Sequence, residues 1–161
     1  MKLLCIDPGP ESSGVVELET TTMEVIECHG EMNNWRLLSS IAYSGCDHLA
    51  IEMIASYGLP VGQSTFHTCV WIGRFIHTFN TNKGMEAYTF VYRKDVRMAL
   101  CGSMMAKDAN IRQALLDKYP ETGGGKTPQI GTKKKPGPLY GIKKHAWAAL
   151  AIGHTHREAN K

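Results

Sequence analysis

The chain has 161 residues, of which 43% are hydrophobic and 20% charged, with a formal net charge of +3. These values favour a single domain, 1–161, with a sizeable core, and the net charge alone does not imply a polyanionic partner. The sequence lacks an apolar run long enough to cross a bilayer and shows no signal peptide, so no membrane partner is expected. Five cysteines without Cys-x-x-Cys spacing argue against a disulfide framework or zinc knuckle and favour a reducing cytoplasm.

The first third of the sequence predicts three strands followed by a helix. In chain order these are strands at 2–7, 13–19 and 23–29, and a helix that runs from Asn33 or Asn34 to Gly45. The second and third runs alternate in polarity, which predicts an antiparallel hairpin. Asparagine is a preferred helix N-cap, and glycine commonly ends a helix.

The middle of the chain alternates between strands and helices. It predicts a strand at 48–53, a helix at about 62–82, a strand at 87–91 and helices at 93–100 and 108–118. Apolar side chains on the helix at 62–82 cover more than one stripe, which predicts burial on two sides. A subunit interface and a deeply buried helix both explain this pattern.

The C-terminal part contains a basic segment and a last helix. Residues 121–141 are rich in glycine, proline and lysine, which is typical of a flexible loop. The last helix is predicted at about 143–157. The order of elements predicts an α/β fold in which a mixed sheet carries helices on both faces.

Two predicted strands end on a carboxylate, Asp7 and Glu52. A carboxylate at the end of a buried strand costs free energy unless it is paired or holds a cation. We expect the first and fourth strands to be adjacent and parallel, which brings both acids to one edge of the sheet. Divalent cations such as Mg²⁺ prefer carboxylate oxygens, and His145 near the last helix is a third candidate. The sequence therefore predicts a metal site at this edge.

Four segments of the sequence are shared with a known nuclease family. They are Ile6-Asp7-Pro8-Gly9 with Ser13-Gly14, Ala50-Ile51-Glu52, Tyr92 to Arg97 leading through Ala106-Lys107, and His145 to Ile152 with His154 and His156. On these segments, in this order, the chain resembles RuvC-type Holliday junction resolvases of the ribonuclease H-like superfamily. Its compact size and lysine-rich segment are more similar to phage-encoded members.

The resemblance implies a ribonuclease H-like, mixed five-stranded sheet and a crossover junction endodeoxyribonuclease. Such an enzyme acts as a homodimer and nicks four-way DNA junctions symmetrically, in recombination or phage DNA processing. The catalytic residues would be Asp7, Glu52 and His145, which would also hold two Mg²⁺ ions, with Mn²⁺ as a substitute and no nucleotide cofactor. Two such ions, ~3.5–4 Å apart, activate a water molecule and stabilise the leaving oxygen. The expected setting is the cytosol of a bacterial or phage-infected cell.

The expected DNA contacts come from basic side chains and one tyrosine. Lys107 matches a family lysine near the scissile phosphate, and its point charge suits a phosphate. Tyr57 follows Glu52 closely and could stack on an unpaired base. The full predicted set is Lys107, Arg93, Lys94, Arg97, Tyr57, Lys133, Lys134, Lys135, Lys143 and Lys144.

One position departs from the family pattern. Ala148 stands three residues after His145, where the family usually carries an acid. Three explanations are open: another acid substitutes, the metal is held more weakly, or cleavage is lost. An engineered change at position 148 that inactivates the enzyme is a further alternative. Asp108 and Asp95 are the candidate substitutes, although Asp108 also fits a helix cap.

The alternatives to a resolvase follow from this departure. The first is a branched-DNA-binding protein with weak or no cleavage, and the second is a flap- or hybrid-specific nuclease of the same fold. An ATP-using protein of the actin and sugar-kinase type also begins with a strand and Asp-x-Gly. That architecture needs two lobes, for which this chain is too short.

Overall fold

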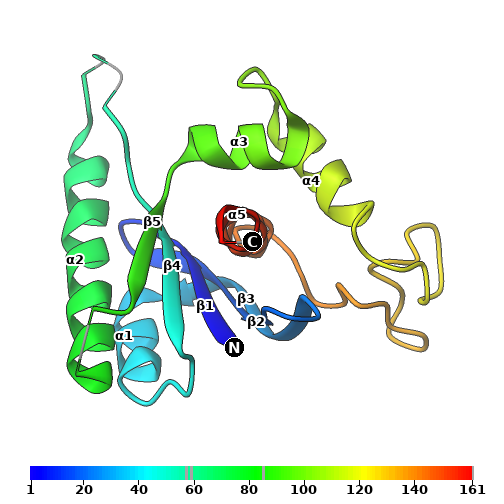
Figure 1. Cartoon of the computed structure of the whole chain (residues 1–161), viewed down its shortest axis with the longest axis horizontal. Helices are drawn as coiled ribbons and strands as arrows, with labels where there is room; N and C mark the ends of the chain where they lie inside the picture. The colour runs from blue at the N-terminus through cyan, green and yellow to red at the C-terminus, as the bar shows by residue number, and fades with distance from the viewer. Residues whose placement is uncertain (57, 59, 85, 161) are drawn as a thin grey trace.

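The structure is a computed structural model that describes residues 1–56, 58, 60–84 and 86–160. Its strands and helices are shown in Figure 1. In chain order they are β1 (Lys2–Asp7), β2 (Ser12–Glu19), β3 (Glu24–Asn33), α1 (Asn34–Ala42), β4 (His48–Glu52), α2 (Gln63–Lys83), β5 (Tyr88–Val91), α3 (Arg93–Cys101), α4 (Asp108–Leu116) and α5 (Ala146–Ala159). Within the described ranges, we find no helix that combines the length and apolar character of a membrane span.

The strands form one mixed sheet in the order β3-β2-β1-β4-β5. β1 pairs antiparallel with β2 and parallel with β4, and β4 pairs parallel with β5. In the β1–β4 pair, Ile6 lies opposite Ile51, so the next residues, Asp7 and Glu52, leave the sheet at the same edge. This confirms both the predicted sheet and the predicted adjacency of the two acid-bearing strands.

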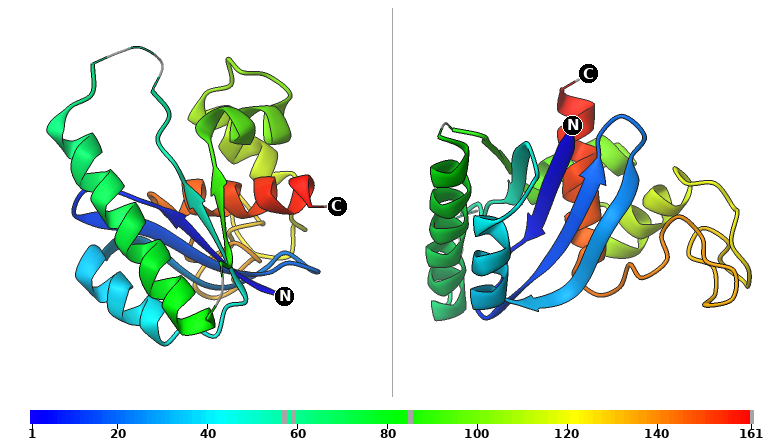
Figure 2. Two further views of the ribbon diagram at one scale, coloured as in Figure 1. Left: turned by 60° about the vertical axis from the view of Figure 1, so that its left-hand side comes forward. Right: turned by 90° about the horizontal axis from the view of Figure 1, so that it is seen from below.

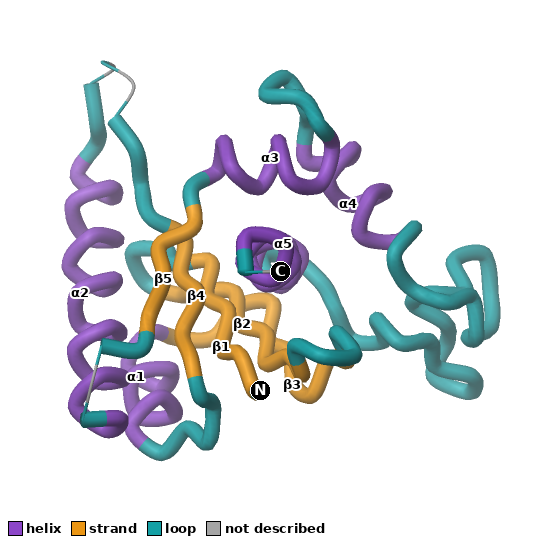
Figure 3. Tube along the Cα trace, viewed as in Figure 1, coloured by secondary structure: helices purple, strands orange, loops and turns teal. Residues whose placement is uncertain are grey.

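Helices cover both faces of the sheet, as predicted. Figures 1 and 2 show α1 and α2 on one face and α5 on the other, with α3 and α4 beyond α5. Figure 3 shows the same layers by secondary structure. Because successive strand residues point to opposite faces, Leu3 and Cys5 pack beneath α5, whereas Leu4 and Ile6 pack beneath α1 and α2. The two buried layers leave the carboxyl ends of β1 and β4 open at one edge.

Some element boundaries differ from the prediction for local reasons. The predicted strand at 23–29 continues to Asn33, whose side chain caps α1 by accepting hydrogen bonds from two backbone N–H groups. The last helix begins at Ala146 rather than at residue 143. Lys144 has a φ of 51°, which is incompatible with a right-handed helix, so the chain turns before α5 begins.

Within the chain, α2 is buried on one face, so the expectation of a deeply buried helix is wrong, whereas burial of its other face at a subunit interface stays a prediction. Its buried side chains include Trp71, Phe75 and Phe79. On the opposite face, Phe66 is 60% exposed and Val70 is 53% exposed. Because apolar side chains lie on more than one side of this helix, a partly hydrophobic surface is exposed to solvent.

Residues 121–141 form neither a helix nor a strand, but they are closed by backbone hydrogen bonds. The Gly123 N–H donates to the Pro128 carbonyl at 2.8 Å, and the Gly137 N–H donates to the Ile130 carbonyl at 2.9 Å. Gly123 and Gly137 lie so close to neighbouring backbone that a Cβ would clash there. Leu139 is fully buried in the core beneath α5. The flexibility of this basic loop stays a prediction, and Gly123 and Gly137 allow its backbone segments to pack closely.

Candidate active site

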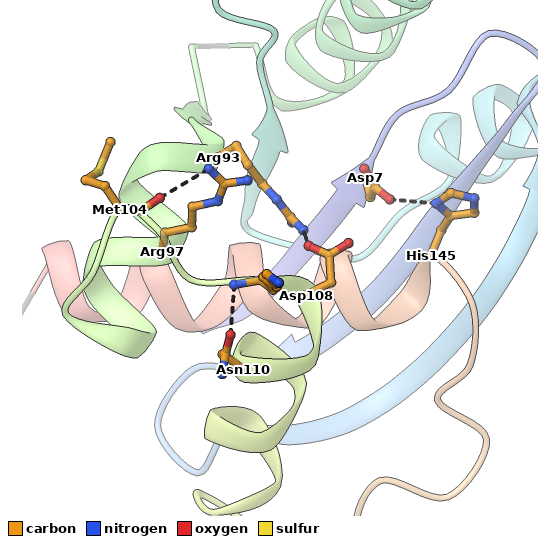
Figure 4. A network of polar contacts seen from close by, with 8 residues as sticks. Asp7, Arg93, Arg97, Met104, Asp108, Asn110 and His145 are labelled. Carbon is orange, nitrogen blue, oxygen red and sulfur yellow. Dashed lines mark hydrogen bonds and ion pairs between the residues drawn. The ribbon is translucent and has the colours of Figure 1, made fainter.

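The three predicted catalytic residues line one open cavity at the carboxyl edge of the sheet. Asp7, Glu52 and His145 share this cavity, of about 670 Å³, with Arg93 and other side chains. Its remaining lining residues are Asp108, Ala109, Ile111, Arg112, Leu115, Lys144, Trp147 and Ala148. Figure 4 shows Asp7, Arg93, Asp108 and His145 grouped here, from the ends of β1, α3, α4 and the turn before α5. The structure thus brings together groups that lie up to 138 residues apart in sequence.

A buried polar network fixes the turn that follows Asp7. The Ser13 hydroxyl donates to the Asn34 side-chain oxygen at 2.7 Å, and the Asn34 amide donates to the Gly9 carbonyl at 2.9 Å. Ser13 and Asn34 are both almost completely buried. Since buried polar groups without partners are costly, the network holds the turn in one conformation. The sequence interpretation had placed Asn34 only as a possible helix cap and had not connected it with Asp7.

Two glycines allow the backbone of His145 to lie against the sheet. A Cβ at Gly14 on β2 would lie 2.4 Å from the His145 carbonyl oxygen. On β3, the Gly30 carbonyl accepts a hydrogen bond from the His145 N–H at 3.2 Å. The His145 ring then places Nδ1 3.0 Å from Asp7 Oδ2. A glycine within an apolar strand often marks such a close approach, but the sequence prediction named Gly14 only as part of a motif.

Burial perturbs both strand-end carboxylates, and the charge of Asp7 adds to the effect at Glu52. Burial raises the pKa of Asp7, although the hydrogen bond and charge of His145 and the charge of Arg93 oppose the rise. Burial, followed by the charge of Asp7, raises the pKa of Glu52 to about 7, with Arg93 again opposing. Two carboxylates so placed are hard to ionise together. A cation between them would relieve the repulsion.

Arg93 and Asp108 form an ion pair across the cavity. Arg93 is the first residue of α3 and Asp108 the first residue of α4. The guanidinium of Arg93 binds the carboxylate of Asp108, and their side chains are 27% and 84% exposed. The interpretation of Asp108 as a helix cap is wrong, because Lys107 is the N-cap of α4. From the sequence, Arg93 was predicted to contact DNA and Asp108 to bind a metal ion.

Whether a metal ion fits this cavity depends on which side chains there can act as ligands. Among the described residues, no set of three or more His, Cys, Asp and Glu side chains could hold a metal ion as it stands. The predicted ligand set of Asp7, Glu52, His145 and Asp108 is therefore not assembled in advance. Asp108 is paired with Arg93, and Nδ1 of His145 faces Asp7. The carboxylates of Asp7 and Glu52 do fit a divalent cation, because both are partly buried, both line the cavity and oxygen ligands suit such an ion.

The other predicted DNA contacts are distributed around this cavity. Lys144 lines it and forms an ion pair with Glu31. Arg97 donates to the Met104 carbonyl at 3.3 Å, and its buried Nε has no hydrogen-bond partner among the residues that the structure describes. The ammonium of Lys94 lies 5.9 Å from the ring centroid of Tyr92.

The remaining predicted contacts are lysines, apart from one tyrosine. Lys107 and Lys143 are exposed, as is the run Lys133–Lys135, and none of them is among the residues that line the cavity. Tyr57, predicted to stack on a base, lies outside the described residues.

Solved structures resemble this chain along almost its whole length. The structure of Thermus thermophilus RuvC superimposes with a TM-score of 0.69 and 16% identity, covering 99% of this chain and 96% of that one. The chain has the RuvC fold. T. thermophilus RuvC in complex with a Holliday junction substrate gives a TM-score of 0.65 at 16% identity, covering 97% and 92% of the two chains. No protein-family model matches the sequence, and no curated protein matches it. The likeness to RuvC concerns the fold, so a phage origin stays a prediction.

Proposed function

We propose that the chain is a divalent-cation-dependent endonuclease that nicks four-way DNA junctions as a homodimer. One observation carries this proposal. Two partly buried carboxylates, Asp7 and Glu52, leave adjacent parallel strands and face a cavity that also contains an imidazole and a guanidinium. This arrangement occurs in a chain with the fold of a protein solved with a Holliday junction substrate.

Asp7, Glu52 and His145 each have a role in phosphodiester hydrolysis. Asp7 and Glu52 would hold the cation, Mg²⁺ with Mn²⁺ as a substitute, which when bound lowers the pKa of water and offsets phosphate charge. The Asp7 carboxylate accepts a hydrogen bond from Nδ1 of His145. This contact orients the ring and leaves Nε2 free to take a proton from the attacking water.

Substrate binding would come from the basic side chains around the cavity. Arg93 and Lys144 line it, and Lys107 lies at the start of α4 beside it. The exposed run Lys133–Lys135 would contact a junction arm away from the cut. Contacts of this kind bind phosphates rather than bases and weaken as the salt concentration rises.

A second copy of the chain fits the exposed apolar face of α2. Phe66 and Val70 lie on that face, and Trp35 of the neighbouring helix α1 is also exposed. A junction has two strands to cut, so a dimer would present one cavity to each. We expect this assembly in a bacterial or phage-infected cytosol, in recombination or phage DNA processing. All five cysteines of the described chain are free, which suits a reducing compartment.

The test is cleavage of a synthetic four-way junction in Mg²⁺. Wild-type protein should nick two strands symmetrically, and Asp7→Asn and Glu52→Gln should each lose ~100-fold or more in rate. Glu24→Gln is the matched control, because Glu24 is an exposed acid on β3 at the opposite end of the sheet. Equal cutting by all four proteins would refute the proposal. Flap and RNA–DNA hybrid substrates in the same assay separate the alternative nuclease specificities.

One observation favours a second candidate, a protein that binds branched DNA with weak or no cleavage. Ala148 lines the cavity that contains Asp7, Glu52 and Asp108, here called the acid cavity, and the first turn of α5 contains no acidic residue. A methyl group contributes no metal ligand at that position. Tight junction binding without cutting in Mg²⁺ or Mn²⁺ would support this candidate, and Ala148→Asp should then raise the cleavage rate.

A further inference from the structure

The acid cavity has fewer metal ligands than a site with two divalent ions requires. Two carboxylates, from Asp7 and Glu52, are available to a cation. The third acid at the cavity, Asp108, is neutralised by its ion pair with Arg93. Ala148 lines the cavity where the family pattern usually has an acid. The donor set therefore fits one divalent ion, whereas the resemblance predicts two.

Arg93 already places a positive charge in this cavity. Its side chain is three-quarters buried, and its guanidinium is held by Asp108 at the start of the next helix. α3 packs against both α4 and α5, so the two residues are carried by elements that are themselves in contact. Arg93 also lines the same cavity as Asp7 and Glu52.

We propose that Arg93 is a catalytic residue whose guanidinium takes the place of a second metal ion. The site would work with one divalent cation at Asp7 and Glu52 and one built-in cation that binds a non-bridging oxygen of the scissile phosphate. A guanidinium suits this role because its N–H groups match the geometry of phosphate oxygens. The inference rests on the proposed nuclease function and specifies the groups that carry it out.

The atoms balance in such a reaction. The oxygen of water forms a new bond to phosphorus, and its proton passes to Nε2 of His145. The bond from phosphorus to the ester oxygen breaks, and that oxygen leaves with the electron pair and takes a proton from solvent. Arg93 stays protonated throughout and stabilises the extra negative charge on the phosphate oxygens, as preorganised cations do at other phosphoryl-transfer sites.

Asp108 would hold Arg93 in place until DNA binds. The Asp108 side chain is 84% exposed, so water can solvate its carboxylate when the phosphate takes over the guanidinium. An ion pair with so exposed a partner contributes little to stability. If the pair served only to join α3 and α4, its loss would have little effect on cleavage. This difference allows the catalytic and structural roles to be separated.

The experiment combines a count of bound ions with a cleavage assay. Free Mn²⁺ is measured by electron paramagnetic resonance during titration of the full chain, in wild type, Asp7→Asn, Arg93→Gln and Arg93→Lys. We expect one Mn²⁺ per wild-type chain, none at that site in Asp7→Asn, and one in both Arg93 variants. Junction cleavage should fall ~1,000-fold in Arg93→Gln and be partly recovered in Arg93→Lys. Arg36→Gln, at an exposed arginine in the first turn of α1, is the control.

The outcomes distinguish the two proposals. Two Mn²⁺ ions per wild-type chain, or normal cleavage by Arg93→Gln, would overturn the role of Arg93 and leave the nuclease proposal intact. The same weak Mn²⁺ binding in wild type and Asp7→Asn would instead overturn the cation site itself. Unfolding of each variant in urea shows whether a loss of cleavage reflects a loss of folded protein.

Discussion

The raised pKa of Glu52 predicts a specific pH dependence of stability in metal-free protein. Its pKa rises from 4.5 to about 7 on folding, chiefly through burial and then through the charge of Asp7. Between these pH values the folded state binds more protons than the unfolded state. The stability contribution is therefore fully present below pH 4.5 and is lost as the pH rises through about 7. Since one pKa unit corresponds to about 1.4 kcal/mol, the whole loss is about 3.5 kcal/mol.

The Glu52→Gln variant removes this effect, because an uncharged amide replaces the carboxyl group. We would measure the free energy of unfolding in urea with EDTA at several pH values from 4.5 to 8, for wild type, Glu52→Gln and the control Glu24→Gln. Relative to Glu52→Gln, the wild type should lose about 3 kcal/mol across this range, and the control should follow the wild type. Saturating Mg²⁺ at pH 8 should restore ~2–3 kcal/mol at 100 times its dissociation constant. Parallel profiles for all three proteins would refute the electrostatic argument.

Three further predictions concern the supports of the site and the expected dimer. Gly14→Ala should lower the unfolding free energy by ~1–3 kcal/mol and reduce junction cleavage, because the new Cβ would displace His145. The control is Gly45→Ala, where a Cβ meets open space, and it should change neither quantity by a measurable amount. Asn34→Ala should cost ~1–3 kcal/mol in urea unfolding, since it leaves buried hydrogen-bonding groups without their partner, and wild-type stability would contradict this. Val70→Glu should convert a dimer to a monomer in sedimentation equilibrium, and a wild-type monomer would argue against the α2 interface.

The convergence of Asp7 and Glu52 could be predicted because the signal is local and the topology is simple. Each acid ends a short apolar run, and two such runs form adjacent parallel strands. The pairing of Arg93 with Asp108 could not be predicted, since it depends on how the starts of two separate helices approach each other. A basic residue at the start of a helix gives no indication of its partner.

The close approach of the last helix to the sheet could not be predicted from the sequence either. Gly14 was recognised as part of a motif, but its function depends on the backbone of His145, which lies far away in the chain. The predicted start of α5 was three residues early because lysine is a good helix former, and Lys144 adopts a positive φ instead. Residues 121–141 have the composition of a linker, yet their glycines allow close backbone packing that composition alone does not reveal.

The most direct test of the account is anomalous diffraction from crystals soaked in Mn²⁺. The account predicts a peak between the carboxylates of Asp7 and Glu52, and its loss in crystals of Asp7→Asn. Well-ordered Mn²⁺ sites elsewhere on the protein, with no density between these two carboxylates, would contradict it.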